Sequence, residues 1–156
     1  MPARSISSAS ILDSEQKYQD FLAEEWRALQ AAPLSSRKAM LVAALVDAQV
    51  DRLFAAHDST GDLLAFRREM GERHPDLGLV MALCSRRAGM DLVTEAVAVP
   101  IADYGGLSVA DFMVSLYNDH SVQQLRLVLP DGSRRGMLEV LGGAMEGLAR
   151  LNNPTR

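Results

Sequence analysis

The densest group of polar side chains lies between residues 115 and 121, where serine, tyrosine, asparagine, aspartate and histidine lie close together. Histidine is the side chain that titrates nearest neutral pH, so a histidine beside a carboxylate could serve an acid–base or metal site. The group stands between a predicted helix and a predicted strand, a common location for a ligand pocket. The candidate ligand-binding residues are Tyr117, Asp119 and His120, together with Tyr104 from the loop before the same helix.

These four residues also have a purely structural explanation. Asp119 and His120 would end the helix, and Tyr104 would close the edge of the core. A helix rises 1.5 Å per residue, so the two ends of this helix are about 15 Å apart. Tyr104 therefore need not share a site with the other three within one chain, and a second chain could contribute it instead.

Metal binding is the next chemistry to consider. His57, His74 and His120 each stand at the predicted C-terminal end of a helix, where a histidine bonds the last carbonyls and complements the helix dipole. Asp47 and Asp51 lie one helical turn apart, but two carboxylates are an incomplete ligand set for a divalent cation. We expect these carboxylates to form a solvated stripe balanced by Arg52, and we predict no metal and no cofactor.

Catalytic motifs are missing from the sequence. It contains no GxxxxGK[ST] phosphate loop, no GxGxxG after a strand, no GxSxG elbow and no HExxH. Cys84 is the only cysteine, so no intrachain disulfide forms, and its neighbours indicate a small core residue rather than a nucleophile. We assign no catalytic residue and leave open whether the protein is an enzyme.

Composition excludes several classes of protein. The chain has 156 residues, the size of one domain, which we place at 13–151 between a flexible N-terminal tail at 1–12 and a C-terminal tail at 152–156. Its net charge of -4 argues against a nucleic-acid partner. No apolar run is long enough to cross a bilayer, and no secretory signal opens the chain, so we predict a cytoplasmic protein. Fourteen arginines against two lysines indicate a GC-rich bacterial source.

The elements that must position these residues follow from hydrophobic spacing. The segment Met40 to Phe54 is apolar on nearly all sides, which predicts a central buried helix with Val42, Val46, Gln49, Val50 and Leu53 on one side. Predicted helices occupy residues 13–32, 35–57, 60–70, 75–88 and 108–117, and predicted strands occupy 92–99 and 122–129. Residues 133–151 form a helical stripe with four glycines that permit close approach by another helix, although 133–140 could instead begin as a hairpin strand.

The predicted fold class is α+β and predominantly helical, with an N-terminal layer of about four helices followed by strand, helix, strand and helix around a small sheet. The 22 residues between Val99 and Val122 are long enough for a crossover, which would make the two strands parallel. Two strands leave both edges open, so an unrecognised strand or a second copy of the chain must complete the sheet. We therefore expect a homodimeric binding or regulatory module without catalysis. The alternative is a small ligand-binding protein or enzyme that uses the junction from Tyr117 to His120.

Overall fold

The computed structural model describes residues 8–57, 60–85, 89–99, 105–117 and 120–152. The described chain forms six helices and three strands, which confirms a mostly helical α+β fold. In chain order the elements are α1 (Ser8–Ala31), α2 (Ser36–Ala56), α3 (Leu63–Arg73), α4 (Pro75–Cys84), β1 (Asp91–Ala98), α5 (Val109–Tyr117), β2 (Ser121–Val128), β3 (Arg134–Gly136) and α6 (Met137–Asn152).

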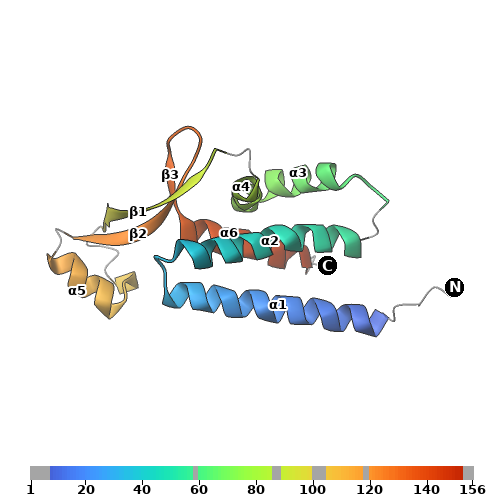
Figure 1. Ribbon diagram of the computed structural model, residues 1–156, viewed down its shortest axis with the longest axis horizontal. Coiled ribbons are helices and arrows are strands. Elements are labelled where there is room, and N and C mark those ends of the chain that lie inside the picture. The colour runs from blue at the N-terminus through green and yellow to red at the C-terminus, as the bar shows by residue number, and fades with distance from the viewer. Residues whose placement is uncertain (1–7, 58–59, 86–88, 100–104, 118–119, 153–156) are drawn as a thin grey trace.

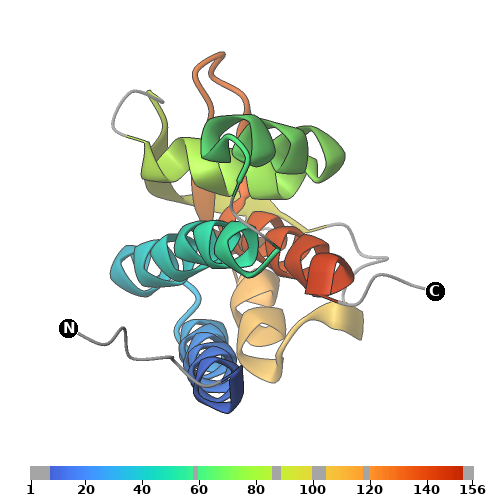
Figure 2. The same ribbon diagram turned by 90° about the vertical axis from the view of Figure 1, so that its right-hand side faces the viewer.

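The helices form three layers with the sheet at one end (Figure 1). Figure 2, turned by 90°, shows α2 and α6 side by side in the middle layer, α1 on one side of them and α3 with α4 on the other. The helix α5 lies beyond the helical layers, next to the sheet. The middle layer is therefore the centre of the core.

The helix α2 is buried in the way that its apolar spacing predicts. Ser35 caps it by accepting a hydrogen bond from the Lys38 N–H at 3.2 Å. The buried side of the helix is Ala39, Val42, Ala43, Val46, Gln49, Val50 and Leu53, which includes all five residues expected there. A helix with so wide an apolar surface can contact α1, α4 and α6 at once.

The helix α1 begins at Ser8, five residues before the predicted start at Asp13. Asp13 is not the residue before the helix but one inside it, where its carboxylate pairs with Lys17 one turn later at 2.8 Å. Neither glycine nor proline occurs between Ser8 and Asp13, so nothing in that segment stops the helix from extending backwards.

The strands β1 and β2 are antiparallel, so the chain does not adopt the parallel arrangement that the length of the connection allows. Their register joins Asp91 to Val128 at one end and Ala98 to Ser121 at the other. The Val99 N–H donates to the His120 carbonyl at 2.7 Å, so the connection that contains α5 returns to the end of the sheet that it left. The nine residues of α5 rise only about 14 Å, whereas an eight-residue strand is about 26 Å long, so this helix does not carry the chain back along the sheet.

A third strand completes the sheet. The sequence 130–133 forms a turn in which the Leu129 N–H donates to the Ser133 carbonyl at 2.8 Å and Gly132 adopts φ +83°. The segment 133–140 therefore begins as a short hairpin strand, β3, over Arg134–Gly136 and continues as α6 from Met137. The strand order is β1-β2-β3, and the missing strand thus comes from the same chain.

Two glycines of α6 let it pack closely against α4. A Cβ built on Gly143 would lie 2.9 Å from the Asp76 Cγ, and one built on Gly147 would lie 3.1 Å from the His74 Cβ. Both distances are shorter than ordinary contacts, so these positions require glycine for the observed approach of the two helices. The expected use of glycine for close helix packing is confirmed.

Candidate binding groove

The predicted ligand-binding residues fall mostly outside the described part of the chain. Tyr104 and Asp119 lie outside the described residues, and so does the side chain of Tyr117. His120 is exposed and has φ +61°, and its carbonyl closes the β1–β2 pair. The structure therefore does not show whether the four predicted residues lie close together.

The other two histidines stand at helix ends, as predicted. The His57 ring has Nδ1 2.9 Å from the Leu53 carbonyl at the end of α2. His74 ends α3 through its backbone N–H, which donates to the Met70 carbonyl at 3.0 Å. Within the described ranges, no group of three or more histidine, cysteine or acidic side chains could hold a metal ion.

The acidic stripe of α2 has a different partner from the one predicted. Arg67 of α3 pairs with Asp47 and, at 2.7 Å, with Asp51. Burial lowers the pKa of Arg67, but hydrogen bonds to both aspartates outweigh it and leave this pKa raised. The predicted partner, Arg52, pairs instead with Glu15 of α1 at 3.1 Å. The prediction was wrong because sequence spacing does not show which face of α2 meets α3.

A buried polar side chain ties α1 to α2. Gln49 is fully buried and donates through Nε2 to Glu15 Oε1 at 2.7 Å. Burial raises the pKa of Glu15, but hydrogen bonds from Gln49 and Gln19 and the charge of Arg52 outweigh it, so the pKa lies below its ordinary value. Glu15 therefore joins α1 to α2 through its contacts with Gln49 and Arg52.

Cys84 packs against the core from the end of α4, which confirms its structural role. Burial is the main cause that raises the pKa of its thiol to about 11, and the nearby charge of Asp47 adds to the effect. Such a thiol carries almost no thiolate at neutral pH, so it is a poor nucleophile.

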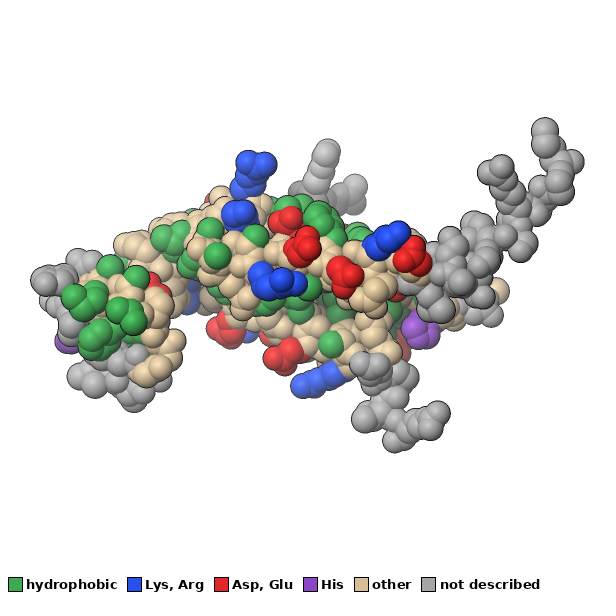
Figure 3. All heavy atoms as spheres, turned by 90° about the horizontal axis from the view of Figure 1, so that it is seen from below, with side chains coloured by type: hydrophobic (Ala, Val, Ile, Leu, Met, Phe, Trp, Pro, Cys, Tyr) green, Lys and Arg blue, Asp and Glu red, His purple; other side chains and the backbone are tan. Residues whose placement is uncertain are grey.

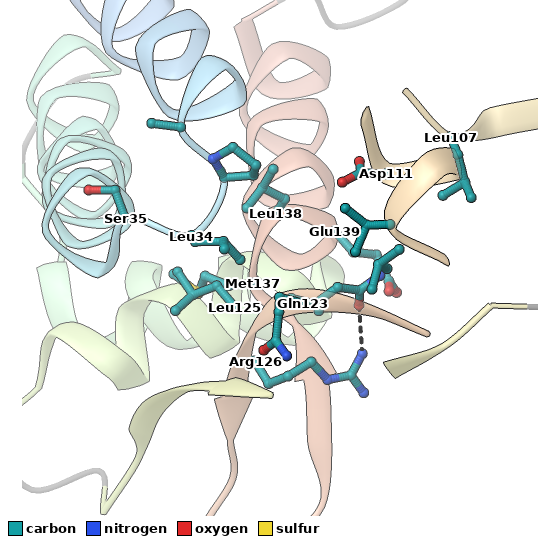
Figure 4. A pocket seen from close by; sticks show the side chains of 16 residues that line it. Leu34, Ser35, Leu107, Asp111, Gln123, Leu125, Arg126, Met137, Leu138 and Glu139 are labelled. Carbon is teal, nitrogen blue, oxygen red and sulfur yellow. Dashed lines mark hydrogen bonds between the residues drawn. The ribbon is translucent and has the colours of Figure 1, made fainter. Parts of the chain in front are cut away.

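A groove of about 710 Å³ lies between the helical layers and α5 (Figure 4). Four segments that are distant in sequence form its walls: the α1–α2 turn, the beginning of α5, β2, and the junction of β3 with α6. Its apolar lining consists of Ala32, Pro33, Leu34, Leu107, Val114, Val122, Leu125, Met137 and Leu138. The mixture of an apolar lining with a few polar groups is typical of a binding site.

Three charged side chains stand at the groove. Asp111 belongs to a reciprocal cap in which the Ser108 hydroxyl donates to its carboxylate at 2.9 Å and its own N–H donates to the Ser108 Oγ at 3.1 Å. Glu139 is paired with Arg135 at 2.9 Å. Arg126 donates to the Gln124 Oε1 at 3.3 Å, the bond drawn in Figure 4, and lies 3.5 Å from a Glu95 oxygen. Asp111 alone of the three has no ion pair within the described chain.

The helix α5 has a second apolar face, directed away from the groove. Val109, Phe112 and Met113 are 81%, 36% and 47% exposed. At 100° per residue these three share one side of the helix, whereas Asp111 and Val114 of the groove lie on the opposite side. Figure 3 shows the resulting group of apolar side chains on α5, at the left end of the molecule seen from below.

The groove could not be found from sequence, because its walls meet only after folding. The signal that sequence did contain is the composition of α5, in which seven of nine residues are apolar. A helix that is apolar nearly all round is normally buried on more than one side, so this composition could have been used to predict contacts on both faces of α5.

Comparisons with known proteins do not identify a family for this chain. No helix in the described ranges is both long enough and apolar enough to span a membrane. Scans of protein-family models, of curated proteins and of solved structures found no match to this chain.

Proposed function

We propose that this protein is a non-catalytic binding module that works as a homodimer, with α5 as the contact between the two copies. The observation that carries this proposal is the outer face of α5, where Val109, Phe112 and Met113 are exposed together. Grouped apolar side chains of this kind mark an interaction surface, in contrast to single exposed apolar residues, which are ordinary.

A second copy is the simplest partner for this face. A nine-residue helix is too short to be stable by itself, so α5 depends on what it packs against. In the structure its contacts are mainly with β2. Two copies related by a twofold axis would bury the same patch on both chains and stabilise both helices. The dimer expected at first from an incomplete sheet is thus supported by a different surface.

The absence of catalysis is also part of this proposal. Glu15, Asp47 and Arg67 are engaged in contacts between helices, and the Cys84 thiol is a poor nucleophile. We also propose a bacterial cytoplasmic location, on the basis of the arginine-rich composition and the single cysteine.

The test is the mass of the native protein at micromolar concentration, measured by native mass spectrometry and by light scattering after gel filtration. We expect the wild-type protein to be a dimer and Met113→Glu to be a folded monomer that keeps the helical circular dichroism spectrum of the wild-type protein. Leu64→Glu is the matched control, because Leu64 of α3 is 70% exposed and lies outside α5, and it should remain dimeric. A monomeric wild-type protein at 100 micromolar, about tenfold above ordinary assay concentrations, would overturn the proposal.

A second candidate function is the binding of a small ligand. Its supporting observation is the groove volume of about 710 Å³, which is within the range of known ligand pockets. The originally expected site, from Tyr117 to His120, stays a competing proposal. Native mass spectrometry distinguishes both from the dimer, because a bound ligand adds mass that disappears on denaturation. If His120→Ala abolishes that added mass, the site is at the helix–strand junction, and if Val114→Asp does so, it is in the groove.

A further inference from the structure

We propose that the groove binds an extended peptide segment of another protein, which adds to β2 as a further strand. This inference rests on the proposed function as a binding module but not on the α5 dimer, since the groove and the outer face of α5 lie on opposite sides of that helix.

The groove runs along an edge of β2. Five consecutive residues of this strand line it, from Val122 to Arg126. Successive side chains of a strand point to opposite faces of a sheet, so a cavity on one face would be lined by alternate residues only. An uninterrupted run indicates that the backbone edge itself faces the groove. Because β1 occupies the other edge along the whole of β2, this is the β3 side.

The backbone of Gln123 points towards this edge. In an antiparallel sheet, the backbone groups of successive residues are directed alternately to the two neighbouring strands. The Leu129 N–H donates to Ser133 on the β3 side, whereas the His120 carbonyl accepts from Val99 on the β1 side. Odd-numbered residues of β2 therefore face β3, and Gln123 is among them.

The neighbouring strand ends before it reaches Gln123. β3 pairs only with residues 126–128, because after Gly136 the chain turns into α6. In the described chain, no strand lies beside Gln123 on this side, and its side chain is exposed. A peptide that continued the line of β3 would run antiparallel to β2 and would pair with Gln123 through both of its backbone groups.

The groove walls indicate the side chains of this peptide. Leu34 of the α1–α2 turn and Val114 of α5 are 44% and 43% exposed, and they offer apolar contacts to alternate side chains of a strand. Among the three charged lining residues, Arg126 and Glu139 have ion-pair partners in the described chain, so Asp111 contributes an uncompensated negative charge, and the whole chain carries -4. The peptide should therefore combine alternating apolar side chains with lysine or arginine. The free edge strand of a second copy, β1, fits poorly because it carries Asp91 and Glu95.

Amide hydrogen exchange of the free protein tests the edge itself. We expect the Gln123 amide to exchange at least about tenfold faster than the Gln124 amide, which faces β1. Equal protection of the two amides would mean that this edge is already paired and would overturn the proposal. A monomeric mass refutes the α5 dimer without changing this exchange pattern, so the two failures are distinguishable.

Binding is tested with a fluorescein-labelled, acetylated hexapeptide of alternating valine and lysine. We expect saturable binding that protects the Gln123 amide, and binding about tenfold weaker when N-methyl groups block the hydrogen-bonding edge of the peptide. A peptide with glutamate in place of lysine should also bind more weakly.

Val114→Asp should weaken peptide binding by a similar factor, whereas Leu64→Asp should not change it. No binding at millimolar peptide, or equal binding of all three peptides, would overturn the proposal. Protection of Gln123 by a small ligand retained from the cell, without peptide binding, would overturn it as well.

Discussion

Replacing Gly143 of α6 with alanine should destabilise the protein, although alanine favours helices. The added Cβ would lie 2.9 Å from the Asp76 Cγ and 3.1 Å from the Asp76 Cβ, so α4 or the aspartate must move. Asp76 is also held by Arg135 at 3.1 Å, and moving it away breaks that contact. Overpacking of this kind costs about 1–3 kcal/mol. Alanine in place of glycine inside a helix raises the free energy of unfolding by about 1 kcal/mol. The expected net loss in the free energy of unfolding is about 1 kcal/mol.

The preceding residue supplies a matched control. A Cβ on Gly142 would lie 3.9 Å from two atoms of the Trp26 ring, which is an ordinary contact distance. Gly142→Ala should therefore keep the full gain in helix propensity and stabilise the protein by about 1 kcal/mol. The two variants have the same composition and differ only in which neighbour the new methyl group meets, so their comparison isolates the α4–α6 contact.

The assay is thermal and urea unfolding of both variants, followed by circular dichroism at equal protein concentration. The expected gap of about 2 kcal/mol corresponds to about 4–8 °C between the two melting temperatures for a chain of this length. If Gly143→Ala melts at or above Gly142→Ala, the close approach of α4 and α6 does not limit stability, and the argument from glycine packing is refuted.

Three further predictions concern the ionisable groups. Because the pKa of Glu15 is lowered by folding, its stabilising effect is complete above the ordinary value of 4.5 and is lost as the pH falls through the folded value. Glu15→Gln should flatten that acid loss in urea titrations, and an unchanged pH dependence would count against the Glu15 contacts. Arg67→Ala should lower the unfolding free energy by about 1 kcal/mol at low salt, whereas the exposed-pair control Arg73→Ala should change it by less than about 0.5 kcal/mol. Because its pKa is raised from 9.0 to about 11, Cys84 should react with iodoacetamide at pH 8 about a hundredfold more slowly than an exposed thiol, and rapid alkylation of the folded protein would contradict this burial.

The helical half of the fold could be predicted well from the sequence. The apolar spacing of residues 40–54 identified the buried side of α2, and the two adjacent serines, Ser35 and Ser36, located its start to within one residue. These features are local, because helix periodicity and capping depend on residues within one or two turns. The start of α1 was predicted less well, since Asp13 has the residue type of a cap but lies inside the helix.

The sheet was harder to predict because strand pairing depends on contacts between distant segments. The length of the connection between β1 and β2 permits either orientation, and only the folded chain shows that it is antiparallel. The three residues of β3 have no periodicity of their own, and they become a strand because the turn at 130–133 brings them beside β2.

The groove could not be predicted from the sequence for the same reason. Leu34, Val114 and Leu138 come from three separate segments, and no local pattern relates them. Sequence reasoning placed a pocket at the end of α5, near His120. The structure places the groove at the beginning of α5, where Leu107 and Asp111 line it.

The hydrogen bond between Val99 and His120 has a consequence for how this molecule can be altered. It brings the two ends of the α5-containing segment together at the end of the β1–β2 pair where Ala98 faces Ser121. The entropy of closing a loop grows only slowly with its length, so a short turn in place of this segment should leave the hairpin and the helical layers intact. We therefore expect the helical layers to fold without this segment, whereas the groove wall formed by Leu107, Asp111 and Val114 would be lost with it.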